Sequence, residues 1–318
     1  MISGAPVLGV RADGGPGRGV GHVARCLALA QAWRDLGGDV VLATEAIPDR
    51  WRSRYEVEQV VVGRPGGVAA DIWVIDGYDL GADVAAGSPH VRIDDRDETG
   101  DGSARLVIDQ NLGASPVDYP QDADRLLLGP RYALLRRDLV AAAVRPEHRP
   151  DGRPPRVLVA QGGAPAESVR GFTAAVVARL PPEIEVIVWS GDDDPVPALR
   201  SADVALVAAG STLWELCLFG VPPIVFTVAR NQVPLAAAMV GAGLAEDGGS
   251  VPGDAHPERV AAQLTGLLAD HVGRLDLADR LRSLVDGRGA IRAARHIWTE
   301  VLGRDLFEIA ASESGQGL

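Results

Sequence analysis

Short apolar runs alternate with stretches that carry apolar residues at helical spacing. The runs are apolar on both faces, which favours strands of a buried parallel sheet over half-exposed strands. In the first half, strands are predicted at residues 7–11, 40–43, 72–75, 91–93, 106–108 and 126–128. A helix is predicted over 22–36, and Gly37 and Gly38 end it. Strands that alternate with helices predict a doubly wound α/β domain.

The alternation restarts after a segment rich in proline and charge, RPEHRPDGRPP at residues 145–155. Strands are predicted there at 156–160, 185–189, 205–207 and 221–227, and helices at 168–180, 213–219 (ended by Gly220), 257–269 and 290–301. We therefore predict an N-terminal domain (1–145), a linker (146–155), a C-terminal domain (156–290) and a final helix with a polar tail (291–318). We expect the carboxyl ends of the strands of both domains to face a common central cleft, because ligands bind at those ends in α/β sheets.

Composition narrows the function. The chain has 318 residues, of which 47% are hydrophobic, and this size fits two globular domains. A formal net charge of −12 argues against nucleic acid as a partner. No apolar run approaches the roughly 20 residues of a membrane span, and residues 1–10 lack a basic leader, so we expect a soluble cytoplasmic protein. Cys26 and Cys217 are predicted to be buried, and no Cys/His spacing indicates a metal site.

A glycine-rich loop at residues 13–21 joins the first strand to the first helix. Its spacing only loosely matches a dinucleotide fingerprint, and it lacks the lysine of a phosphate-binding P-loop, so a plain tight turn stays an alternative. His22 opens the helix, where the helix dipole disfavours a cationic ring. A neutral imidazole can act as a general base, and a structural cap is the competing interpretation.

Polar residues follow three further strands: Asp76-Gly77-Tyr78-Asp79, Asp94-Asp95 and Asp109-Gln110-Asn111. Helix capping or turn formation could explain each group taken alone. Three groups at one sheet edge favour a functional site.

The second half carries a candidate anion site. Gly162-Gly163 and Gly210-Ser211-Thr212 each follow a strand, and free amides at a helix start can bind a diphosphate. Glu215 has capping-box spacing from Thr212 or could accept hydrogen bonds from a ribose diol. Asn231 and Gln232 could orient a sugar or a water molecule, or form a loop turn.

Several motifs together carry a family resemblance over about residues 9 to 245. They are RADxxxxxGxGHxxRCLxLA from Arg11, IDxY at Ile75–Tyr78, IDD at Ile93–Asp95, LLLGPRYALLR at Leu126–Arg136, the Gly162-Gly163 pair, AGSTxWExCxxGxP at Ala209–Pro222 and the Asn231-Gln232 pair. The chain thus resembles the UDP-2,4-diacetamido-2,4,6-trideoxy-β-L-altropyranose hydrolases of pseudaminic acid biosynthesis and the related spore-coat polysaccharide proteins. It departs from them at residues 160–166, where AQGGAPA replaces a loop with Thr and Asp, and this leaves the sugar and the acceptor open.

The resemblance implies a GT-B-like fold of two Rossmann-like domains, with UDP bound mainly by the C-terminal one. It implies inverting, metal-independent hydrolysis of a UDP-sugar without a cofactor. His22, as the base for water, Tyr78 and Asn231 take the family's catalytic positions, and Glu215 takes the position of its ribose-binding glutamate. The predicted substrate-binding residues are Asp13, Gly19, Gly21, Arg25, Gly162, Gly163, Gly210, Ser211, Thr212, Glu215 and Gln232.

Three functions remain open. The resemblance favours a UDP-sugar hydrolase, for which water is the acceptor. The altered loops favour the alternative, a GT-B glycosyltransferase that moves the sugar to a small-molecule or polysaccharide acceptor. A nucleotide-sugar-binding protein without catalysis is the third. The oligomeric state is left open.

Overall fold

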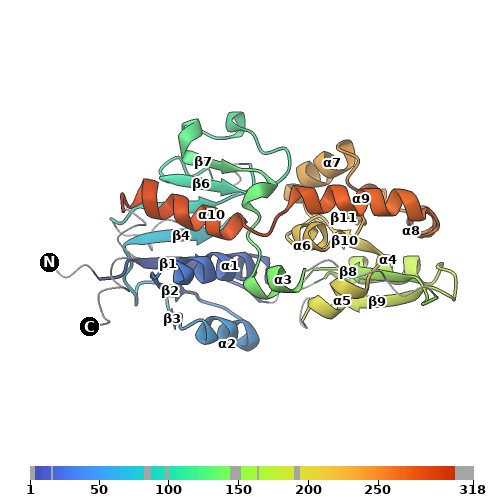
Figure 1. Ribbon diagram of the computed structural model, residues 1–318, viewed down its shortest axis with the longest axis horizontal. Helices are drawn as coiled ribbons and strands as arrows, with labels where there is room; N and C mark the ends of the chain where they lie inside the picture. Colours follow the sequence, from blue (N-terminus) through green and yellow to red (C-terminus); the bar gives the residue numbers. More distant parts are fainter. Residues whose placement is uncertain are drawn as a thin grey trace, which may run out of the picture. The chain divides into compact units, whose positions relative to one another are not determined.

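The computed structural model describes residues 4–15, 17–81, 87–96, 100–143, 152–162, 165–189 and 194–304. The chain forms two compact units, each built on a parallel β-sheet (Figure 1). The first unit comprises the described parts of Met1–Gly15, His22–Arg137 and Arg288–Leu318, and the second those of Pro16–Gly21 and Asp138–Gly287.

The first sheet has seven strands among the described residues, in the order β3-β2-β1-β4-β5-β6-β7, and all its pairings are parallel. The strands are β1 (Val7–Ala12), β2 (Asp39–Ala43), β3 (Val61–Gly63), β4 (Ile72–Asp76), β5 (His90–Ile93), β6 (Leu106–Asp109) and β7 (Leu126–Leu128). Every residue of β4, β5 and β6 is buried, as strands apolar on both faces require.

The first unit also contains α1 (Gly21–Asp35), α2 (Asp49–Val57) and the 3-10 turns η2 (Pro116–Asp118), η3 (Ala123–Arg125) and η4 (Pro130–Tyr132). The helical periodicity that predicts α1 is real, because its apolar positions from Val23 to Trp33 are buried. Gly37 follows the helix at φ 84°, a left-handed conformation that glycine adopts without strain.

The second sheet has five strands in the described residues, all parallel, in the order β12-β11-β10-β8-β9. They are β8 (Arg156–Ala160), β9 (Glu185–Trp189), β10 (Val204–Ala208), β11 (Pro223–Thr227) and β12 (Glu246–Ser250). The helical elements of this unit are α3 (Arg137–Ala142), α4 (Glu167–Val177), α5 (Val196–Ser201), α6 (Thr212–Phe219), η5 (Arg230–Gln232), α7 (Val233–Gly241), α8 (Pro257–Ala269) and α9 (His271–Leu284).

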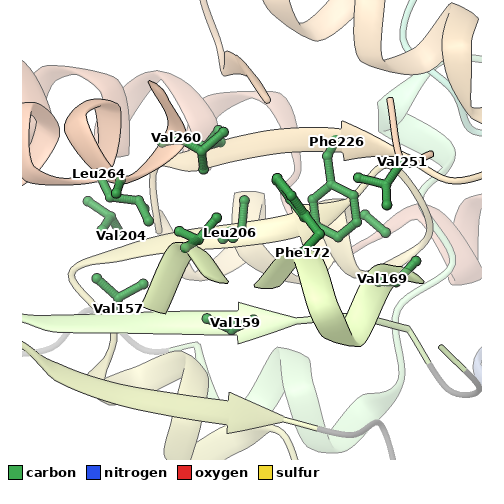
Figure 2. Packing of buried hydrophobic residues seen from close by; sticks show 14 residues of the cluster. Val157, Val159, Val169, Phe172, Val204, Leu206, Phe226, Val251, Val260 and Leu264 are labelled. Carbon is green, nitrogen blue, oxygen red and sulfur yellow. The ribbon is translucent and has the colours of Figure 1, made fainter. Parts of the chain in front are cut away.

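One face of the second sheet packs against α4 and α8 (Figure 2). Alternate strand residues supply this face, for example Val157 and Val159 of β8, because successive side chains of a strand point to opposite faces. Phe172 of α4 contacts Phe226 of β11, with ring centroids 5.6 Å apart (Figure 2). This apolar layer fixes the strands whose carboxyl ends carry the predicted diphosphate turns.

The last helix, α10 (Gly289–His296), belongs to the first unit, although it follows α9 of the second in sequence (Figure 1). It continues into a π-helical turn, η6 (Ile297–Val301), where Trp298 contacts Trp33 of α1 with the two rings tilted and their centroids 4.8 Å apart. Its first residue, Gly289, touches the backbone of Ala133. The LLLGPRYALLR motif thus forms β7, η4 and the surface on which α10 begins.

The predicted strands and the doubly wound topology are confirmed, and Gly220 ends α6 at φ 66° as expected. Residues 146–151 of the predicted linker lie outside the described residues. Both cysteines are buried as predicted. In the described residues, no helix is long and apolar enough to cross a membrane.

Gly289→Ala is expected to destabilise the chain by about 1–3 kcal/mol, the cost of overpacking a tight contact. A Cβ at this position would lie 2.6 Å from the nitrogen of Ala133, a backbone atom that cannot move aside alone. Gly266→Ala in α8 is the matched control, because its Cβ would meet nothing within 4 Å. Denaturant unfolding of both variants measures the effect, and equal stability of the two would contradict this packing.

Candidate functional site

The first candidate site lies at the point where the strand order of the first sheet reverses, between β1 and β4. β1 lies between β2 and β4, so the segments that follow β1 and β4 diverge at the carboxyl edge. Ligands bind at such switch points in open α/β sheets. Asp76 ends β4 opposite Ala12 of β1, and His22 lies in the first turn of α1.

His22 and Asp76 form a histidine–carboxylate pair. Nδ1 of His22 lies 2.7 Å from Oδ1 of Asp76, whose side chain is fully buried, whereas His22 is 20% exposed. Because a carboxylate only accepts hydrogen bonds, this contact places the ring proton on Nδ1. Arg25 Nη2 lies 3.4 Å from the same nitrogen, but both are donors, so the shorter Asp76 contact decides the tautomer. Nε2 is then the nitrogen of neutral His22 that can accept a proton.

Arg25 balances the charge of Asp76. Its Nε donates to Oδ2 at 2.7 Å and its Nη2 to Oδ1 at 2.6 Å. Burial alone would raise the pKa of Asp76, but Arg25 and then His22 lower it well below its usual range. Burial alone would lower the pKa of Arg25, and Asp76 raises it well above its ordinary value. Arg25 is predicted to bind substrate, and its observed partner is this buried carboxylate.

Tyr78 contacts the ring of His22. The two rings meet edge to face, with centroids 5.5 Å apart and an interplanar angle of 82°. The Tyr78 hydroxyl donates to Oδ2 of Asp95, and Asn111 Nδ2 donates to Oδ1 of the same carboxylate at 2.5 Å. The structure therefore brings together two of the three predicted catalytic residues, His22 and Tyr78.

Asp109 extends this network to β6. Its carboxyl group is fully buried and accepts from the Tyr119 hydroxyl at 2.7 Å and from the Asn111 amide at 2.8 Å. Burial raises the pKa of Asp109 to about 6. The negative charge of Asp95 also raises this pKa, whereas the hydrogen bonds from Asn111 and Tyr119 lower it. The polar groups that follow β4, β5 and β6 thus form one connected network, as their position at one sheet edge predicted.

Asp76, Asp95 and Asn111 were expected at a site only as members of the polar groups that follow three strands, and no role was predicted for them individually. Their sequence signal was their place just after consecutive parallel strands, where helix capping or turn formation was the more common explanation of any one group. What distinguishes them is burial and pairing, for example Asp76 with the ring of His22, and these come from tertiary structure.

Asp13, Gly19 and Gly21 lie in the segment that runs from the end of β1 to the start of α1. Oδ1 of Asp13 accepts from Arg11 Nη1 at 2.7 Å, the Thr44 hydroxyl at 2.9 Å and the Glu45 amide at 2.8 Å. Burial alone would raise the pKa of Asp13, but these partners lower it to about 2. This oxygen therefore joins the ends of β1 and β2. Gly19 has φ 71°, and Gly21 is the first residue of α1.

The second candidate site is the switch point of the second sheet. β8 pairs with both β10 and β9, so the segments after β8 and β10 diverge there. Gly162 follows β8 at φ 86°, and Gly163 lies outside the described residues. Gly210, Ser211 and Thr212 follow β10, and Thr212 begins α6.

The turn before α6 contains two backbone amides that have no acceptor in the helix. The Gly210 amide donates to Ala208, and those of Leu213 and Trp214 donate to the carbonyls of Gly210 and Ser211. The amides of Ser211, the N-cap residue, and Thr212, the first residue of the helix, have no helical acceptor. Within the described chain, the Ser211 hydroxyl caps none of these amides.

Glu215 lies in the first turn of α6 and is only 8% exposed. Thr212 lies inside the helix, where its side chain is not the N-cap, so the capping-box interpretation lacks its cap residue. Asn231 and Gln232 lie in η5 after β11, and Gln232 Oε1 accepts from the Val228 amide at 2.9 Å. Asn231 and Gln232 therefore belong to the second unit, while His22 and Tyr78 belong to the first.

The chain resembles a curated relative in sequence. No family model matches it. It is 27% identical over 219 residues to the spore coat polysaccharide biosynthesis protein SpsG of Bacillus subtilis (strain 168). The match covers 60% of this chain and 61% of the length of that relative. This similarity supports the resemblance to the spore-coat polysaccharide proteins.

Solved structures show the fold. The glycotransferase of kitacinnamycin matches with a TM-score of 0.65 at 18% identity and covers 92% of this chain and 98% of its own. MurG of Acinetobacter baumannii matches with a TM-score of 0.62 at 14% identity, over 92% and 99% of the two chains. A UDP-N-acetylglucosamine 2-epimerase matches with a TM-score of 0.58 at 13% identity, over 95% and 97%. The chain has the GT-B fold, as expected.

The raised pKa of Asp109 predicts a pH dependence of stability. Between about pH 4 and 6 the folded chain keeps a proton that the unfolded chain releases, so the free energy of unfolding falls as the pH rises. A pKa change from 3.8 to about 6 corresponds to a loss of about 3 kcal/mol. The Asp109→Asn variant has no such carboxyl group and does not lose this stability. Its free energy of unfolding relative to the wild type is therefore expected to rise as the pH rises from about 4 to about 6.

Denaturant unfolding of both proteins from about pH 4 to about 7 measures this difference. Asp122→Asn is the control, because Asp122 is exposed and its side chain makes no capping hydrogen bond in the described structure. A stability difference between Asp109→Asn and the wild type that does not change with pH would contradict the assignment.

Proposed function

For a GT-B chain similar to the spore-coat polysaccharide proteins, we propose the transfer of a sugar from a nucleotide-sugar donor to a hydroxyl-bearing acceptor. The acceptor is a small molecule or a polysaccharide, and the proposed nucleotide is UDP. The glycosyltransferases among the structural neighbours support transfer more than they support the hydrolysis favoured by the sequence.

The observation that carries this proposal is the pair of His22 and Asp76. The imidazole of His22, whose side chain is 20% exposed, has the buried carboxylate of Asp76 2.7 Å from its Nδ1. Arg25 keeps that carboxylate ionised, so Nδ1 stays the donor in the pair. Because Nδ1 is held as a donor, only Nε2 of this imidazole can take a proton from a nucleophile, as a general base does.

The proposed reaction uses this geometry. His22 Nε2 takes the proton of the acceptor hydroxyl as its oxygen attacks the anomeric carbon. The bond between that carbon and the diphosphate oxygen breaks with inversion, and the nucleoside diphosphate leaves with the electron pair. The proton goes to the neutral imidazole, and the ionised Asp76 beside the ring stabilises the imidazolium that forms.

We assign the leaving diphosphate to the switch point of the second sheet. The amides of Ser211 and Thr212 at the start of α6 can donate to phosphate oxygens, and the helix dipole favours negative charge there. Glu215 on the same helix is proposed to accept hydrogen bonds from the ribose hydroxyls. Asn231 and Gln232 after β11 are proposed to contact the sugar.

Hydrolysis is the second candidate, because His22 could activate water as readily as an alcohol. The motifs shared with the diacetamido-trideoxyhexose hydrolases favour it. A panel of UDP-sugars, with and without candidate acceptors, separates the two. UDP release that depends on the acceptor, with a conjugate detected by mass spectrometry, supports transfer, and release in water alone supports hydrolysis. Tight UDP binding with no turnover would indicate a nucleotide-sugar-binding protein without catalysis.

His22→Ala is expected to lower kcat by about 10²–10⁴-fold, the usual contribution of a general base. Nucleotide affinity should stay the same, because His22 is not assigned to the nucleotide. UDP release and UDP titration calorimetry measure the two quantities. His256→Ala is the matched control, since His256 is exposed and its side chain caps no amide in the described structure. Unchanged turnover in His22→Ala would refute the role.

Glu215→Gln is expected to weaken UDP binding by about 10–100-fold, the range for a hydrogen bond to a charged group. Turnover at saturating donor should change much less. Calorimetric titration of UDP measures the loss, with the exposed Glu183→Gln as the control. An unchanged UDP affinity would remove Glu215 from the nucleotide site.

A further inference from the structure

Two carboxylates share one guanidinium beside the ring of His22. Arg25 Nη2 lies 2.6 Å from Oδ1 of Asp76, and Arg25 Nη1 lies 3.8 Å from Oδ1 of Asp95. With a neutral imidazole, these four linked side chains therefore carry one negative charge in excess. An imidazolium at His22 would balance that charge.

The excess charge is poorly solvated. The side chains of Arg25 and Asp95 are 8% and 12% exposed, and that of Asp76 is fully buried. A buried charge without a partner is costly, so a positive charge in contact with the cluster is stabilised. Nδ1 of His22 lies 2.7 Å from Oδ1 of Asp76 and 3.4 Å from Arg25 Nη2, so its imidazolium is in direct contact with the cluster.

Asp95 supplies the charge that is in excess. Asp76 is closely compensated, because its two oxygens accept from Nε and Nη2 of Arg25. Burial alone would lower the pKa of Arg25, and Asp76 and then Asp95 raise it, so the guanidinium interacts with both carboxylates. Without Asp95, the charges of Arg25 and Asp76 would cancel, and the proton on the ring would gain less.

The hydrogen bonds to the two carboxylates come from neutral groups as well as from Arg25. Asn111 Nδ2 donates to Oδ1 of Asp95 at 2.5 Å, and the Tyr78 hydroxyl donates to Oδ2. Cys26 Sγ donates to Oδ2 of Asp76 at 3.5 Å, and burial raises the pKa of this thiol well above its ordinary value. These neutral donors hold the carboxylates in place and leave the charge of the cluster unchanged.

The titratable groups behind Asp95 are further carboxyl groups. Asp94 Oδ1 accepts from the amide of Asp95 at 2.6 Å. Burial raises the pKa of Asp109, and the charge of Asp95 raises it further. Arg96 is the next cation along the chain, and its Nη2 donates to the carbonyl of Gly113 at 3.0 Å.

We infer that Asp95 is a positioning residue that acts through Arg25 and stabilises the protonated form of His22. It keeps Arg25 shared between two carboxylates, so that the ring balances the remaining charge when it takes a proton. His22 is thereby a stronger base than its contact with Asp76 alone would make it. The inference rests on the proposed function in one respect, that His22 takes a proton during the reaction.

Asp95→Asn tests the charge without a need for activity, because it removes the charge and nearly keeps the shape. The chain has six histidines, so labelling histidine with ¹⁵N gives a short spectrum in which His22→Ala assigns one titrating ring. We expect the midpoint of that titration to fall by about one pH unit in Asp95→Asn, a usual effect of one nearby charge. It should stay in place in the exposed control Asp122→Asn. An unchanged or raised midpoint in Asp95→Asn would overturn the inference.

Asn111→Ala separates charge from shape, because it removes the hydrogen bond at Oδ1 and keeps the carboxylate of Asp95. Its midpoint should move much less than that of Asp95→Asn. Asp95→Ser removes the same charge with a different shape and should give a fall similar to that of Asp95→Asn. Denaturant unfolding checks that each variant is folded. Equal shifts in Asn111→Ala and Asp95→Asn would contradict a role of the charge.

The consequence for turnover is measured with a nucleotide sugar that the wild type uses. The acid limb of kcat/KM should move to lower pH in Asp95→Asn by the same amount as the midpoint, and kcat above that limb should fall by about 3-fold, because a weaker base takes the proton. A limb that stays in place while the midpoint moves would show that His22 is not the base, so the proposed function would fail and the inference would stand. Absence of turnover in the wild type would also contradict the proposed function, and the NMR titration would then decide the inference by itself.

Discussion

The buried carboxylate of Asp76 is the interaction on which the candidate site depends. It ends a fully buried strand, so it must be compensated, and Arg25 compensates it through two hydrogen bonds. The remaining acceptor capacity meets Nδ1 of His22. One ion pair thus fixes both the tautomer and the orientation of the imidazole, and α1 supplies both partners because residues 22 and 25 lie on the same face of a helix.

Much of the fold is encoded locally. Apolar runs such as that of β4 and β10 are buried on both faces, and their order along the chain gave the two doubly wound sheets. Two of the elements that were not predicted from the sequence, β12 and α9, lack this signal. β12 has the sequence EDGGS, which carries no apolar pattern, and it is a strand because its backbone pairs with β11. α9 follows α8 after one residue and has few buried positions, so its periodicity is weak.

The candidate site was predictable in part. The place of His22 at a helix start and of polar groups after parallel strands followed from sequence. The pairing of Asp76 with His22, and the link from Tyr78 through Asp95 to Asn111, did not follow, because residues 54, 17 and 16 positions apart meet only in the folded sheet. The helix dipole was the only influence on His22 that sequence supplied, whereas the structure adds a carboxylate at Nδ1.

The proposed role of His22 depends on which ring nitrogen carries the proton of the neutral imidazole. ¹⁵N NMR of histidine-labelled protein, at a pH where the imidazole is neutral, reports which nitrogen carries it, and loss of one signal in the alanine variant assigns His22. We expect a proton on Nδ1 and none on Nε2, and we expect that preference to be lost when Asp76 is replaced by asparagine. A proton on Nε2 in the wild type would contradict it.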